Sequence, residues 1–146
     1  MSEKTIVIGS DHAGFSFKET IKKLLQDKGL AVKDVGPENT DSCDYPVYAK
    51  KLCKVVLKEN IPGILVCGTG IGMSMTANRF VGIRAAVCAT EYQCRMARLH
   101  NDANVLCLGE RVTGPGLAAS ILDAFLETEF EGGRHKRRID LIEPGD

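Results

Sequence analysis

A cysteine followed by alternating glycines is the stretch of this sequence best suited to chemistry. Residues 63–78 read GILVCGTGIGMSMTAN, in which an apolar run ends at Cys67 and a glycine-rich turn follows. Backbone N–H groups converge where such a turn opens a helix, and they lower the pKa of a nearby thiol from about 8.5 toward neutral. We therefore expect Cys67 to act as a nucleophile or general base, although a strand-end cysteine is more often a small buried hydrophobe.

The turn itself predicts an anion site. Gly68, Gly70 and Gly72 let the backbone bend sharply and aim N–H groups into one space. The turn lacks the Lys-Ser/Thr pair of a P-loop and the spacing G-x-G-x-x-G, so we do not expect a dinucleotide site. Thr69 is placed either to hydrogen-bond Cys67 or to cap the following helix. The alternative to an oxyanion-binding turn is a plain tight connection between strand and helix.

Further reactive or charged side chains follow strands, lie in a loop or stand at helix ends. They are Asp11, His12, Asp44, Tyr45, His100, Asn101, Arg111, Arg134 and Arg138. Asp11 has an alternative role as a helix cap, Asp44 as part of an Asx turn, and His100 as a partner of a helix dipole. Solvated arginines are common, but Arg134 and Arg138 are spaced i, i+4 and can grip one phosphate if that segment is helical.

The elements that position these residues follow from hydrophobic periodicity. Short apolar runs predict strands at residues 5–9, 30–35, 64–66, 83–89 and 105–108. Helical spacing predicts helices between residues 17 and 29, 48 and 60, 71 and 78, 91 and 100, and 116 and 129, with a long loop at 36–46. Thr90 is the expected cap of the fourth helix.

Strands that alternate with helices predict right-handed βαβ units. The fold class is therefore α/β, a three-layer α/β/α sandwich around a doubly wound five-stranded parallel sheet, Rossmann-like or flavodoxin-like. Because ligands bind at the carboxyl ends of such strands, we expect Asp11 and Cys67 to face one cleft.

Length, charge and hydropathy limit the number of domains and the kinds of partner that the protein can have. The 146 residues form one expected domain, 1–146, in which 131–146 is a basic C-terminal tail. A formal net charge of zero argues against a general nucleic-acid or membrane-surface binder. No apolar run approaches the roughly 18 residues of a membrane span, and the first apolar segment is too short for a signal peptide. We therefore expect a cytoplasmic protein.

The six cysteines show neither a C-x-x-C pair nor zinc-type spacing, so free thiols are expected. Cys53, Cys88 and Cys107 fall in apolar or amphipathic segments and are expected to be buried hydrophobes. The roles of Cys43 and Cys94 stay open. Met73 and Met75 are expected to be packing residues.

Taken together, these motifs resemble the type B ribose-5-phosphate isomerases and the related galactose-6-phosphate isomerase subunits. Besides the glycine turn, the matching segments are GSDHAGF at 9–15, DYPVYA at 44–49, GIRAAVC at 82–88, RLHNDANVL at 98–106, GERVTG at 109–114 and EGGRHKRR at 131–138. The resemblance implies interconversion of ribose 5-phosphate and ribulose 5-phosphate through an enediolate, in the non-oxidative pentose phosphate pathway, without metal or cofactor. It also implies a homodimer or homotetramer whose active sites lie between subunits.

The resemblance also assigns roles. Cys67 would move the proton between C2 and C1, with Thr69 tuning it. His100 would assist opening of the furanose ring, helped by Asp44, and Asp11 would exchange protons with substrate oxygens. The binding residues would be Gly68, Gly70, Gly72 and Ser74 for the enediolate, Tyr45 and Asn101 for the sugar, and His12, Arg111, Arg134 and Arg138 for the phosphate. One branch of the family uses a glutamate at the position of Met73, but methionine cannot act as a base.

Two other functions are compatible with the sequence. One is a hexose-6-phosphate isomerase of the same family, acting on galactose or allose 6-phosphate. The other is a non-catalytic module that senses a phosphosugar or a nucleotide. A base, a ring-opening histidine and phosphate ligands in one chain favour the pentose enzyme over a subunit that works only in a mixed complex.

Overall fold

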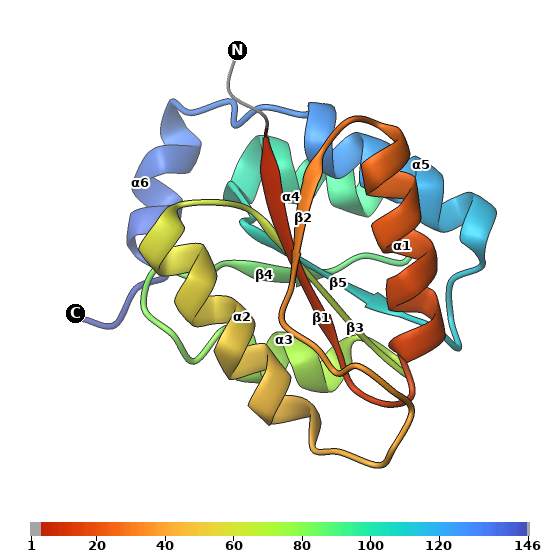
Figure 1. Ribbon diagram of the computed structural model, residues 1–146. Coiled ribbons are helices and arrows are strands. Elements are labelled where there is room, and N and C mark those ends of the chain that lie inside the picture. Colours follow the sequence, from red (N-terminus) through yellow and green to blue (C-terminus); the bar gives the residue numbers. More distant parts are fainter. Residues whose placement is uncertain (1–3, 146) are drawn as a thin grey trace.

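The computed structural model describes residues 4–145, in which five strands alternate with helices (Figure 1). The strands are β1 (Thr5–Ser10), β2 (Ala31–Asp34), β3 (Gly63–Cys67), β4 (Ala85–Val87) and β5 (Val105–Gly109). The helices are α1 (Phe15–Asp27), α2 (Tyr45–Glu59), α3 (Ile71–Ala77), α4 (Glu91–Asn101), α5 (Pro115–Glu127) and α6 (Arg134–Asp140).

All strand pairs are parallel, and the strands lie in the order β2-β1-β3-β5-β4. β3 and β5 are buried along their whole length, which explains why their sequences are apolar without alternation. β4 is shorter than the predicted strand at 83–89 because it lies at the sheet edge and pairs with β5 through only three residues.

Helices cover both faces of the sheet, which confirms the three-layer architecture (Figure 1). Apolar side chains of α1, α4 and α5 pack on one face and those of α2 and α3 on the other. Most helical residues that face the sheet are fully buried, and this burial supplies the main driving force for the fold. Within residues 4–145, every helix is too short or too polar to cross a membrane.

One helix start agrees with the sequence prediction, one differs, and the predicted tail contains a helix of its own. The Thr90 side chain accepts the Gln93 N–H at 3.0 Å, as expected of a cap. α2 begins at Tyr45, because Pro46 suits a first helical turn, so the predicted loop at 36–46 ends two residues earlier. The tail at 131–146 contains α6, in which His135 and Ile139 are buried, and is not simply a solvated charge run.

Candidate active site

The carboxyl edge of the sheet brings Cys67 and Asp11 together. Cys67 is the last residue of β3, and Asp11 follows β1, which pairs with β3 along its length. The Asp11 N–H donates to the Val66 carbonyl at 3.2 Å, so the two residues lie on adjacent strands at the same end. The Asp11 side chain is buried and accepts the Gly14 N–H at 2.9 Å, so it also holds the turn that precedes α1.

The glycine turn directs a backbone donor at the Cys67 thiol. The Gly70 N–H donates to Cys67 Sγ at 3.0 Å, and Gly70 has a left-handed φ of 85° that favours glycine. The Thr69 hydroxyl oxygen accepts the Ile71 N–H at 3.2 Å, a local turn bond, while Gly70 stands at the N-cap of α3 without a side-chain cap. The turn therefore fixes the position of the Cys67 sulfur, as a base or nucleophile requires.

Two close approaches leave no room for side chains around this turn. A Cβ on Gly109 would lie 2.7 Å from the Thr69 backbone, and one on Gly72 would lie 2.7 Å from the Tyr45 ring. Tyr45 therefore lies over the start of α3. The Ser74 hydroxyl donates to the Ile71 carbonyl at 2.7 Å.

His12 is joined to the loop that precedes α2. Its Nδ1 accepts the Cys43 N–H at 3.1 Å, which leaves Nε2 to carry the proton of a neutral ring. Cys43 Sγ lies 3.9 Å from the same nitrogen. The sequence did not identify Cys43, because a backbone donor in a loop leaves no residue-type signal. Asp44 directly follows, exposed at the N-cap of α2.

Arg111 reaches the turn from the loop after β5. Its N–H donates to the Gly68 carbonyl at 3.0 Å, and its guanidinium packs against Gly68. The predicted site residues at this end of the sheet form the carboxyl-edge group: Asp11, His12, Asp44, Tyr45, Cys67, Gly68, Thr69, Gly70, Gly72, Ser74 and Arg111.

The other predicted site residues lie near the amino ends of the strands, at the opposite edge of the sheet. They form the amino-edge group: His100, Asn101, Arg134 and Arg138. His100 and Asn101 end α4, and the Asn104 carbonyl just beyond accepts the N–H of Gly63, the first residue of β3, at 2.9 Å. Cys67 ends that strand, four residues or about 13 Å away. Asn101 also lines a cavity of about 350 Å³ next to residues 142–144. One chain therefore does not unite the two groups.

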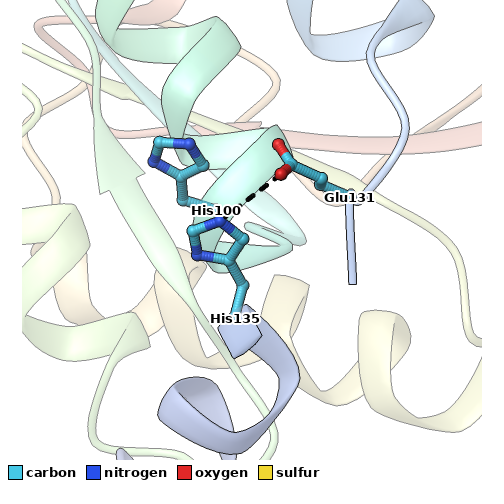
Figure 2. Close-up of side chains that lie close together, drawn as sticks. All are labelled: His100, Glu131 and His135. Carbon is cyan, nitrogen blue, oxygen red and sulfur yellow. Dashed lines mark ion pairs between the residues drawn. The ribbon is translucent and has the colours of Figure 1, made fainter. Parts of the chain in front are cut away.

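His100 stacks on a residue that the sequence did not single out. The rings of His100 and His135 are 4.3 Å apart at 13°, and His135 Nε2 lies 3.8 Å from Glu131 Oε1 (Figure 2). The possible ligand atoms of the three side chains lie within 4.8 Å of one another, which is close enough for all three to contact one metal ion. Nearly parallel rings, however, cannot both direct a lone pair at one ion, and Arg134 and Arg138 lie on the same helix. The arrangement is thus a stacked pair.

Three of the other buried cysteines, Cys53, Cys94 and Cys107, have raised pKa values, whereas a hydrogen bond with Cys94 lowers the pKa of Cys88. Burial raises the pKa of Cys53 to about 12 and that of Cys107 well above its usual value. A hydrogen bond with Cys88, together with burial, raises the pKa of Cys94. All six cysteines are free thiols. The expectation for Cys53, Cys88 and Cys107 is confirmed, and Cys94 joins them in the core, whereas Met75 is 67% exposed and does not pack as expected.

Comparison with known proteins identifies the class. Residues 6–142 match the Ribose/Galactose Isomerase family, and the chain belongs to it. Ribose-5-phosphate isomerase B of Escherichia coli is 45% identical over 140 residues, which are 95% of this chain and 94% of that protein.

Solved structures give the same result. A ribose 5-phosphate isomerase from Thermotoga maritima is 50% identical, with a TM-score of 0.95 over 97% of this chain and 99% of that one. Ribose-5-phosphate isomerase B from Clostridium thermocellum is 47% identical, with a TM-score of 0.93 over 94% of each chain. The parallel α/β fold is therefore that of these isomerases.

Proposed function

We propose that this protein interconverts ribose 5-phosphate and ribulose 5-phosphate. The observation that carries the proposal is the Cys67 sulfur, held by the Gly70 amide beside Asp11 at the carboxyl edge of the sheet. Some relatives that span nearly the whole chain are named ribose-5-phosphate isomerase B, and others are named putative sugar phosphate isomerase. Six free thiols suit a reducing compartment, and we propose the cytoplasm.

Isomerisation moves one proton between neighbouring carbons. Cys67, as thiolate, removes the proton from C2 of the open-chain aldose and returns it to C1, while Thr69 lies next to it. Asp11 moves the proton between the two substrate oxygens. A positioned base of this kind contributes about 10²- to 10⁴-fold. The amides of Gly70 and Ile71 donate to the Cys67 and Thr69 side chains, so the remaining amides of the turn at 68–72 bind the developing enediolate oxygen, where each donor is worth roughly 3 kcal/mol.

Arginines of both groups, together with His12, hold the phosphate. His12 offers Nε2–H, because its Nδ1 already accepts the Cys43 N–H. Arg111 lies beside the turn. Arg134 and Arg138 are exposed, one turn apart on α6, which suits two guanidinium groups that grip one phosphate.

A complete site needs two copies of the chain. Because the carboxyl-edge and amino-edge groups lie at opposite ends of β3, a two-fold symmetric homodimer can pair one group with the other, twice. Ile71, Met75 and Val81, in and after α3, are 50%, 67% and 64% exposed and offer apolar surface for such a contact. A homotetramer would repeat the same arrangement.

The function is tested by incubating the purified protein separately with ribose 5-phosphate and galactose 6-phosphate and measuring the ketose formed. We expect kcat/KM for the pentose phosphate to exceed that for the hexose phosphate by at least about tenfold, which corresponds to about 1.4 kcal/mol of transition-state binding. Higher turnover of the hexose phosphate would identify the protein as a hexose-6-phosphate isomerase. Binding without turnover of either sugar would favour a sensor.

A further inference from the structure

The C-terminal segment is joined to the end of α4 at three successive residues. The contacts are Arg98 Nε to the Thr128 carbonyl at 3.0 Å, the Glu131 N–H to the Leu99 carbonyl at 3.0 Å, and the His100 ring on the His135 ring at 4.3 Å. Two of these contacts are hydrogen bonds to backbone carbonyls, and the third is a stack between two side chains. The segment at 128–135 therefore holds the end of α4 and covers one face of the His100 ring.

His135 is built into the domain rather than attached to its surface. It is only 5% exposed and shares its buried helix face with Ile139, one turn further along α6. Its Nε2 is buried and has no hydrogen-bond partner within residues 4–145, while Glu131 Oε1 lies 3.8 Å away (Figure 2). An unpaired buried polar atom is destabilising, so an apolar residue would be the better choice for stability alone.

The His100 ring is constrained on one face and accessible elsewhere. The stacked His135 ring covers that face at an interplanar angle of 13°, and His100 is partly exposed at the end of its helix. Without the stack, a histidine at a helix end samples several side-chain rotamers. The stack therefore restricts the orientations that the His100 ring can adopt.

We propose that His135 is a positioning residue that fixes the ring of His100 for opening of the sugar ring. The inference rests on the proposed function. In that step the C1–O4 bond breaks, O4 gains a proton from His100, and the O1 proton passes to Asp44 as the C1 carbonyl forms. A misaligned donor slows this proton transfer but leaves the later transfer by Cys67 intact.

The charges around His135 are consistent with this role. The groups facing it are His100 from α4, Arg134 and Arg138 from α6, and Glu131 from the preceding loop. Burial, followed by His100 and the arginines, lowers the pKa of His135. A neutral His135 lets His100 carry a proton without a like charge stacked against it.

The test compares His135→Ala, which removes the stack, with His135→Phe, which keeps a stacked ring and removes Nε2. Two reactions are measured. Turnover of ribose 5-phosphate requires ring opening, whereas exchange of the C1 hydrogen of ribulose 5-phosphate in D2O does not, because this ketose is acyclic. We expect His135→Ala to lower kcat for ribose 5-phosphate roughly 10- to 100-fold with little change in KM, because misalignment acts on the reacting geometry.

The exchange reaction should remain near the wild-type rate in His135→Ala, and His135→Phe should keep ribose 5-phosphate turnover within about threefold of wild type. His135→Asn, which also lacks a stacked ring, should behave like His135→Ala and serves if the alanine variant does not fold. Wild-type turnover in the folded alanine or asparagine variant overturns the inference. Equal loss of both reactions, or a phenylalanine variant as impaired as the alanine one, also overturns it. If the wild-type protein itself does not isomerise ribose 5-phosphate, the proposed function fails instead.

Discussion

The sulfur of Cys67 accepts a hydrogen bond from the backbone N–H of Gly70 at 3.0 Å. This contact is possible because Gly70 adopts a left-handed φ of 85° between the end of β3 and the start of α3. The bond fixes the position of the sulfur at the end of β3. The turn therefore serves the thiol directly as well as connecting a strand to a helix.

Close packing of this turn predicts that Gly109→Ala damages the site. The new Cβ would lie 2.7 Å from the Thr69 backbone, so the turn must move away from β5. We expect a loss of about 1–3 kcal/mol in the free energy of unfolding, measured with urea, together with reduced turnover.

The matched control is Gly116→Ala in α5. A Cβ there meets no heavy atom within 4 Å, and the position is helical. We expect stability unchanged or higher by up to about 1 kcal/mol. If Gly109→Ala proves as stable and active as Gly116→Ala, the turn is not fixed by its contact with β5.

Separation of the two groups predicts complementation between inactive variants. Cys67→Ala disables the carboxyl-edge group and His100→Ala the amino-edge group. In a symmetric dimer, a heterodimer of the two has one intact site and one doubly defective site. Mixing the variants in equal amounts under conditions of subunit exchange should restore roughly a quarter of wild-type turnover. No recovery, despite heterodimers detected by mass spectrometry, would mean that each site belongs to one chain.

A buried lysine predicts a stability effect at the loop that carries Cys43. Lys18 is 1% exposed, and its Nζ donates to Asp34 at 2.7 Å and to the Pro37 carbonyl at 2.9 Å. Lys18→Met removes these bonds and should cost about 2–3 kcal/mol in urea unfolding. Lys23→Met, which loses a surface pair with Asp27, should change stability by less than about 1 kcal/mol. Equal effects would show that Lys18 does not anchor the loop.

The same anchor predicts sensitivity to acid. Burial opposes ionisation of Asp34, but hydrogen bonds from Lys18, Gly36 and Lys22 outweigh it and lower the pKa of Asp34 below its usual 3.8. A carboxyl with a depressed folded-state pKa stabilises the fold above the unfolded value and loses this contribution as pH falls below it. We therefore expect wild-type stability to fall between pH 5 and 3 more steeply than that of Asp34→Asn, as measured by thermal unfolding.

His135 predicts a second pH effect, at higher pH. Its pKa is lowered from 6.5 in the folded state, so the unfolded chain binds the proton more tightly. The cost to stability is absent above pH 6.5, begins as pH falls through that value, and is complete below the folded-state pKa. His135→Phe should remove this part of the pH dependence between pH 7.5 and 5.5, whereas an unchanged slope would show that His135 titrates normally.

The hydrophobic pattern was sufficient to predict the fold, because a strand that is buried on both faces of the sheet has an uninterrupted apolar sequence. The uninterrupted apolar runs at β3 and β5 predicted strands, and both strands are buried throughout. The signal was weaker at β4, where edge residues are partly exposed, and the predicted strand was too long. Pro46 concealed the start of α2, because the same residue suits a loop and a first helical turn.

The site was harder to predict, because contacts between distant segments leave no local pattern. Adjacent strands placed Asp11 beside Cys67 as expected, since β1 and β3 pair directly. His135, in contrast, lies among four cations at 134–138, and that composition resembles a solvated segment. Only the packing of α6 on α4 turns its ring toward His100. The carboxyl-edge and amino-edge groups are far apart because α4 runs back toward the amino ends of the strands and places His100 there. Sequence motifs alone do not show this direction.

The most direct test of the account is the turnover number for ribose 5-phosphate in Cys67→Ala compared with wild type. Cys53→Ala, which alters a cysteine buried in α2 away from the turn, is the control and should retain wild-type turnover per folded molecule. If Cys67 is the base, its loss should lower kcat by about 10²- to 10⁴-fold while the protein stays folded. A folded Cys67→Ala protein with turnover close to that of wild type would contradict the account.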